Sequence, residues 1–160
     1  MNTLYLASVW LHILAATAWI GGMIFLVAVI VPILRRPETR DHASELMQLA
    51  GRRFRVVGWV AFATLLVTGV LNVIHRGYEP THFFTGEVFQ GSWGRTLAHK
   101  LGIVALVLVM SALHDFWIGP KASQGDAESR EKWRTMARAM GRTTFALSLV
   151  ILALAVSLVR

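Results

Sequence analysis

Residues 4–34 read LYLASVWLHILAATAWIGGMIFLVAVIVPIL, an apolar run without a single Lys, Arg, Asp or Glu. A helix needs about 20 mostly apolar residues to cross the hydrocarbon core of a bilayer. A cleaved signal peptide would instead have a positively charged first segment and a shorter apolar core. We therefore expect this run to be a retained membrane-spanning helix, which must tilt, bend near Pro32 or project beyond the bilayer.

Three more apolar segments of suitable length follow, at residues 54–74, 97–118 and 143–159. The 160-residue chain is 55% hydrophobic and 16% charged, whereas a soluble domain carries about 25% charged residues. Cysteine is absent, which excludes disulfides, thiolate copper sites and iron–sulfur clusters. The predicted fold is all-α: an integral membrane four-helix bundle, up-down-up-down, forming a single transmembrane domain over residues 1–160 in the lipid bilayer.

The distribution of Lys and Arg predicts the orientation, because cytoplasmic loops are enriched in both. Twelve of the sixteen lie in or beside the first and third connections, and four lie elsewhere. These two connections are therefore predicted to be cytoplasmic, with both termini outside, in a multi-pass membrane protein. The net charge of +7 comes from the basic residues of these connections. It therefore does not indicate nucleic acid as a partner.

The connections differ in character. Between residues 126 and 142 an apolar stripe recurs at helical spacing: Trp133, Met136, Ala137 and Met140. This pattern predicts an amphipathic cytoplasmic helix lying on the membrane surface. The outer connection, residues 75–94, is rich in Gly and aromatics and could fold back as a lid. Near the inner end of the third span, Asp115 is expected to pair with Arg138 or Arg142.

Three histidines lie near one predicted depth, at the outer side of the membrane. His12 is about 12 Å into the first span at 1.5 Å per residue, His75 closes the second and His99 opens the third. Ionisable residues within a membrane are costly and are therefore functional candidates. Imidazole is a good ligand for iron, copper and zinc. The three histidines are the predicted metal ligands.

Helical spacing supports an inward-facing site. In the first span three residues fall near one line of the helix: His12, Trp19 and Met23. In the second span a polar stripe follows one face: Thr64, Thr68, Asn72 and His75. Polar faces of membrane helices turn to the bundle interior, although such residues also serve ordinary interhelical hydrogen bonding. Asn72, one turn before His75, is a candidate partner for its imidazole.

Haem b between two histidines is the leading cofactor prediction, because a helical bundle holds such a group between facing helices. His12 with His99 is the first candidate pair and His12 with His75 the second, while Arg95 or Lys100 could pair with the haem propionates. The protein would then be a small membrane cytochrome passing electrons from a donor such as quinol to a periplasmic redox partner.

Three alternatives remain open from the residues alone. The same histidines could bind or transport copper. The chain could be an oxidoreductase, oxidising a tetrapyrrole or quinol at the outer pocket. It could also be a structural assembly subunit without a cofactor. A homo-oligomer is compatible with each of these alternatives.

Two stretches resemble known membrane families. WLHILAATAWIGGMIFLVAVIVP (10–32) resembles the first helix of the CopD-type copper-resistance membrane domain, with its histidine, Trp and Gly-Gly. SWGRTLAHKLGIVALVLVMSALHDF (92–116) resembles that family's Gly–Leu–Lys–Leu helix and a His-x-Lys-Leu helix of HemJ-type haem-binding proteins. RRFRVVGWVAFATLLVTG (52–69) is similar to the second helix of both groups.

The resemblance implies a polytopic bacterial membrane protein that handles copper or haem. The positions that match the motifs are His12, Trp19, Gly21, Gly22, Lys100 and His114. His99 directly precedes Lys100, whereas the HemJ-type pattern has one residue between them. CopD-type proteins are often longer than this chain, so a stand-alone four-helix version need not move copper.

Overall fold

The computed structural model describes residues 3–122 and 126–158, which form helices and turns and contain no strand. Four helical stretches within these residues are long and apolar enough to cross a membrane: Thr3–Leu34, Pro37–His75, Gly91–Lys121 and Ala127–Ser157. Large apolar side chains on their outer faces are exposed, as a lipid environment requires; Val60 and Val67, for example, are 62% and 60% exposed. The predicted all-α membrane fold is confirmed, and the chain is a multi-pass membrane protein.

The chain divides into two compact units, residues 1–79 and 80–160. Each unit is a hairpin of two long helices, and each is described by itself. That the two units act as a single domain stays a prediction.

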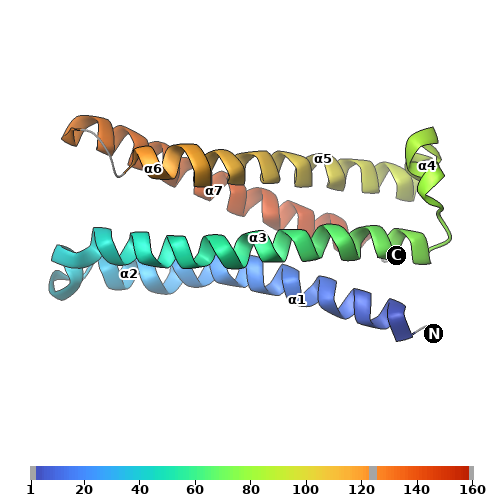
Figure 1. The fold of residues 1–160 in the computed structure, drawn as a ribbon, viewed down its shortest axis with the longest axis horizontal. Helices are drawn as coiled ribbons and strands as arrows, with labels where there is room; N and C mark the ends of the chain where they lie inside the picture. The colour runs from blue at the N-terminus through green and yellow to red at the C-terminus, as the bar shows by residue number, and fades with distance from the viewer. Residues whose placement is uncertain (1–2, 123–125, 159–160) are drawn as a thin grey trace. The chain divides into compact units, whose positions relative to one another are not determined.

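The first unit begins with α1 (Thr3–Phe25), which continues without a break through a π-helical segment, η1 (Leu26–Ile30), into α2 (Val31–Leu34). A 3-10 helix, η2 (Pro37–His42), reverses the chain. The long helix α3 (Ala43–His75) then returns antiparallel along α1 (Figure 1).

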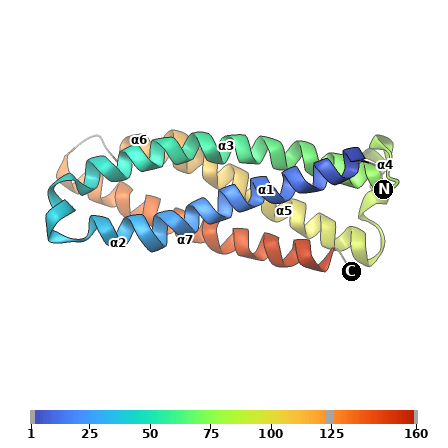
Figure 2. The same ribbon diagram turned by 90° about the horizontal axis from the view of Figure 1, so that it is seen from below.

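The second unit repeats this plan after a short helical lead-in. Its elements in chain order are α4 (Pro80–Thr85), η3 (Glu87–Phe89), α5 (Gly91–Leu113), η4 (His114–Ile118), α6 (Gly119–Lys121) and α7 (Ala127–Ser157). The segment η4 is π-helical, as η1 is. Helices α5 and α7 pack against each other, and their opposite directions can be followed in Figure 2.

The interface between α1 and α3, called the first seam below, has the spacing of a coiled coil. Residues of α1 that face α3 alternate three and four positions apart: Tyr5, Ser8, His12, Ala15, Trp19 and Gly22. This alternation keeps one stripe of a helix against its neighbour. At the α2 end the indole of Trp19 lies 4.5 Å from the ring of Phe62 between centroids, and the Phe54 ring covers Gly22.

Each π-helical segment precedes a proline by one residue. Pro32 follows η1 and Pro120 follows η4, each at the second position of the next helix. A proline ring clashes with the carbonyl four residues earlier, and that carbonyl falls inside the π-helical segment in both hairpins. The wider π turn lets the helix run through the proline, a local solution that the apolar pattern of the sequence did not indicate.

The helices extend beyond the predicted spans. Helix α3 begins at Ala43 rather than near residue 54, and α7 runs unbroken from Ala127 to Ser157. The amphipathic helix expected at 126–142 is the first half of α7, which continues without a break into the fourth apolar segment. Its location on the membrane surface stays a prediction. Trp133 in its apolar stripe contacts the Lys121 ammonium, 4.7 Å from the ring centroid.

Candidate functional site

Polar side chains cluster at one end of the first seam. On α1 they are Tyr5, Ser8 and His12, and on α3 they are Thr68, Asn72 and His75. Ser8 is 4% exposed, and its hydroxyl donates a hydrogen bond of 2.8 Å to Oδ1 of Asn72. This confirms the expectation that the polar stripe of α3 faces another helix.

His12 is held by a short chain of hydrogen bonds. The Thr68 hydroxyl donates to the carbonyl of Thr64 over 2.6 Å, so its single proton is committed. Nδ1 of His12, 2.8 Å from Oγ1 of Thr68, must therefore be the donor in that contact. Neutral His12 then carries its lone pair on Nε2, the form in which imidazole binds a metal.

The imidazole of His12 lies close against the backbone of α3. Its Cε1 lies 3.6 Å from where a Cβ on Gly69 would stand, so the absence of a side chain at Gly69 lets the ring approach the α3 backbone. His12 is half-buried and Thr68 is 4% exposed. Holding a charge here would be costly, which favours a neutral imidazole as ligand.

His75 lies at the open end of the same seam. It is exposed, its Nδ1 donates to the Leu71 carbonyl over 2.7 Å, and its ring is 5.6 Å from that of Tyr5. Because a carbonyl only accepts, Nδ1 is again protonated and Nε2 is the basic nitrogen. Asn72 accepts a hydrogen bond from Ser8, so Asn72 holds the helix pair together beside His75.

Trp19 packs against α3 on the side of the polar cluster that leads toward α2. It is 6% exposed, between Phe62 and Gly58 of α3. The predicted line of His12 and Trp19 on one face of the first span is therefore confirmed. The structure shows Trp19 as a packing residue; a contact with a cofactor stays a prediction.

The remaining predicted site residues belong to the second unit. His99 is exposed, and its Nδ1 donates to the carbonyl of Arg95 over 2.8 Å. Arg95 is itself exposed, while Lys100 is half-buried, three residues after the buried Leu97 on the same face of α5. Any ligand set that joins His12 with His99 would combine the two units and stays a prediction.

Within residues 3–122 and 126–158, no three side chains of the His, Cys, Asp and Glu types gather around a point where a metal ion could be held. Closed sites with three or four such ligands are therefore not built from these residues in the chain as described. Metal sites with fewer than three such ligands, or with methionine sulfur among the ligands, are not excluded by this geometry.

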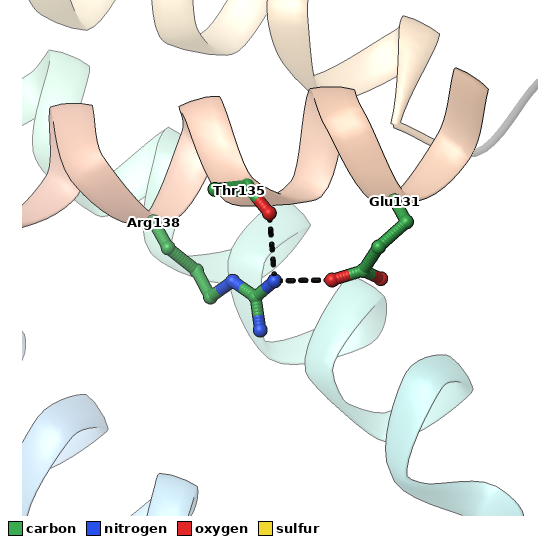
Figure 3. Close-up of polar contacts among 3 residues, drawn as sticks. All are labelled: Glu131, Thr135 and Arg138. Carbon is green, nitrogen blue, oxygen red and sulfur yellow. Dashed lines mark hydrogen bonds and ion pairs between the residues drawn. The ribbon is translucent and has the colours of Figure 1, made fainter. Parts of the chain in front are cut away.

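Asp115 and Arg138, which were expected to pair with each other, each have a local hydrogen-bond partner. Nδ1 of His114 donates to Oδ1 of Asp115 over 3.0 Å. Arg138, one of the two predicted partners of Asp115, contacts Glu131 at 2.5 Å and Thr135 at 3.0 Å on its own helix (Figure 3).

Sequence reasoning missed Tyr5 and Ser8. Both belong to the alternating three-and-four spacing that leads to His12, and that spacing was the available signal. A serine and a tyrosine are unremarkable in an apolar run, whereas their partners on α3 became visible only when the two helices were placed in register.

Comparisons with known proteins add the family. An uncharacterized protein of Aquifex aeolicus (strain VF5) is 34% identical over 149 residues, which are 92% of this chain and 90% of that protein. The copper transport protein CutJ of Bacillus subtilis (strain 168) is 29% identical over 107 residues, 66% of this chain. The chain spans only 18% of the length of CutJ. No solved structure matches the chain.

The family model of CopD, copper resistance protein D, matches residues 48–158. This range includes His75, His99 and Lys100, but not His12 or Trp19. The matches support the copper alternative of the sequence prediction and give no support to haem. More than half of the chain lies within the match, and the chain therefore belongs to the CopD family.

Proposed function

We propose that this chain is a copper-binding or copper-transport module of the membrane, with His12 as an intramembrane ligand. The observation that carries the proposal is the relay from His12 through Thr68 to the Thr64 carbonyl. It fixes the proton on Nδ1 and leaves Nε2 as the basic nitrogen. Such outer hydrogen bonds orient a ligating histidine and raise its basicity.

Copper would be the bound or transported ion, and its ligand preferences match the histidines of the seam. Imidazole nitrogen binds copper well, and a neutral imidazole needs no counter-charge in an apolar seam. His75 is exposed at the end of the seam and His12 is half-buried farther along it. His75 would receive the ion and His12 would hold it deeper.

The orientation belongs to the same proposal. Basic residues in the first and third connections favour a cytoplasmic location for both. The ends of α1 and α3 that carry Tyr5 and His75 would then face the periplasm, in a protein of the inner membrane. Copper would be taken up from the outer side.

The test is metal analysis and an absorption spectrum on detergent-purified protein loaded with Cu⁺ under anaerobic conditions. We expect bound copper, with one ion per chain lost on His12→Ala and none lost on His42→Ala, a matched control since His42 is exposed in η2. A Soret band in protein as isolated would favour haem b. Copper binding unaffected by His12→Ala would overturn the assignment of His12.

A further inference from the structure

The two helices of the second unit are fixed in register by contacts at both ends. Trp93 Nε1 donates to the carbonyl of Leu158 over 3.3 Å, where α5 begins and α7 ends. At the opposite end the Lys121 ammonium lies over the ring of Trp133. Because α5 and α7 run in opposite directions, these two contacts set which residues are level in between.

This register places Met140 of α7 level with the turn of α5 that contains Ser111 and His114. Met136 lies one turn earlier on α7 and is level with the turn that follows His114, which belongs to η4. The segments η4 and α7 are in contact. On α5, Met110 lies one turn before His114, whose backbone N–H bonds to the Met110 carbonyl. Residues four apart are neighbours on a helix surface.

Helical spacing assigns all four residues to equivalent flanks of α5 and α7. In an antiparallel pair, equivalent flanks of the two helices meet. On the helical wheel Met110 and His114 lie on the flank of α5 that corresponds to the flank of Met136 and Met140 on α7. Met110, His114 and Met140 are half-buried, and Met136 is 39% exposed. Ligands in this cluster would thus be sheltered and still accessible to an ion.

In its neutral form, His114 has the tautomer required of a ligand. Its Nδ1 donates to Oδ1 of Asp115 at 3.0 Å. A carboxylate that accepts from Nδ1 leaves the lone pair of the imidazole on Nε2 and increases its basicity. The histidine is also the first residue of the π-helical segment η4, and π-helical turns occur frequently at functional sites.

We propose that Met110, His114 and Met140 form a second copper site, specific for Cu⁺, at the end of α5 that leads into η4. Thioether sulfur is a soft ligand that selects Cu⁺ over harder ions. Met136 is the fourth sulfur within the cluster. The inference rests on the proposed function for its cargo, but it uses none of the residues assigned there and lies wholly within the second unit.

The alternative explanation is packing, because methionine fills irregular gaps in apolar interfaces. Leucine has nearly the volume of methionine and is the least disruptive replacement. The decisive variant is therefore Met110→Leu with Met140→Leu. Met47→Leu is the matched control, since Met47 is 40% exposed on α3 in the other unit. His114→Gln removes the imidazole by a separate route.

The experiment titrates Cu⁺, with Ag⁺ as its redox-inert substitute, into detergent-purified protein in competition with a chromophoric chelator. We expect two ions per chain in the wild type and in Met47→Leu. The double methionine variant and His114→Gln should each keep one ion, and His12→Ala should lose the other. Copper X-ray absorption on the wild type should show sulfur in the first coordination sphere, a result that does not depend on any variant folding.

The outcomes separate the two proposals. An ion count unchanged by the double methionine replacement, or an absorption spectrum without sulfur, overturns the second site and leaves the His12 proposal standing. Loss of an ion in the double variant with no effect of His12→Ala supports the second site and overturns the first. A wild type that binds neither Cu⁺ nor Ag⁺ overturns both.

Discussion

Nδ1 of His12 on α1 and Oγ1 of Thr68 on α3 lie 2.8 Å apart across the interface between the two helices. The Thr68 proton is used in the bond to the Thr64 carbonyl, so the contact defines the tautomer of His12 as well as its position. One threonine therefore connects the packing of the helix pair to the metal-binding capacity of the imidazole.

Replacing Thr68 with Val should weaken copper binding while leaving the helix pair intact. Valine has the shape of threonine but cannot accept from Nδ1, so His12 loses its orientation and its fixed tautomer. Loss of such an outer partner reduces metal affinity by about 10–100-fold. Chelator competition measures this directly, and Thr68→Ser, which keeps the hydroxyl, should retain most of the affinity. Equal affinities for the Val and Ser variants would contradict the relay.

Much of the fold was predictable because membrane spans are set by length and apolarity alone. The four spans and the inward polar face of Thr68 and Asn72 follow from such simple patterns. The π-helical segments before Pro32 and Pro120 could not be predicted in this way, since they arise from a local conflict between proline and the backbone hydrogen bonds of the helix. Helix α3 begins at Ala43, well before the apolar segment that starts at residue 54, because charged residues form helices as readily as apolar ones do.

The candidate site was predictable in part. His12 and His75 were found because histidine is conspicuous in an apolar run, and both belong to the first seam. The side-chain partners that hold His12 and Asn72 required register between helices, which one sequence does not contain. The methionine cluster illustrates the same limit. Met110 and Met140 are thirty residues apart in the chain and became level only through the contacts at Trp93 and Lys121.

Gly94 should tolerate no side chain. A Cβ there would stand 2.7 Å from the Val88 carbonyl oxygen and closer still to the backbone of Phe89, and backbone cannot rotate away. Overpacking of this kind costs about 1–3 kcal/mol. Gly94→Ala should therefore lower the thermal unfolding temperature in detergent. Gly102→Ala, on the same helix with nothing within 4 Å of its Cβ, should leave it unchanged or raise it slightly.

Trp19→Ala should destabilise the first hairpin strongly. The indole is 6% exposed and packs on Phe62, and truncation of a buried Trp costs about 3–5 kcal/mol. Trp10 is 63% exposed, so Trp10→Ala is the matched control for loss of an indole from the same helix. Thermal or denaturant unfolding followed by circular dichroism should rank the two variants. Equal stability of both would mean that the seam does not depend on this contact.

The orientation can be tested because the chain lacks cysteine. Single-cysteine variants at exposed positions report which side of the membrane they face. In spheroplasts, Thr85→Cys in α4 should react with a membrane-impermeant maleimide. Asp41→Cys in η2 should react only after the membrane is permeabilised. The reverse pattern would show that the count of basic residues predicts the wrong orientation and would place His12 on the cytoplasmic side.

Asp126 caps the start of α7, and this contribution should depend on pH. Its side chain accepts from the backbone N–H of Ser129 at 3.1 Å, and the side-chain hydrogen bond with Ser129 is the main cause of a lowered pKa of the carboxyl. A pKa below that of the unfolded chain, about 3.9, means that folding favours the carboxylate. The stabilisation is then complete above the unfolded-state pKa and disappears as the pH falls through the folded-state pKa.

The measurement compares unfolding temperatures of wild type, Asp126→Ala and Asp126→Asn in non-ionic detergent at neutral and acidic pH. At neutral pH the alanine variant should be the least stable, because it lacks a cap. The advantage of wild type over alanine should shrink in acid, since the protonated carboxyl is a poorer acceptor. Asparagine caps without titrating, so its advantage over alanine should persist. An advantage of wild type that is constant with pH would show that the carboxylate charge is not part of the cap.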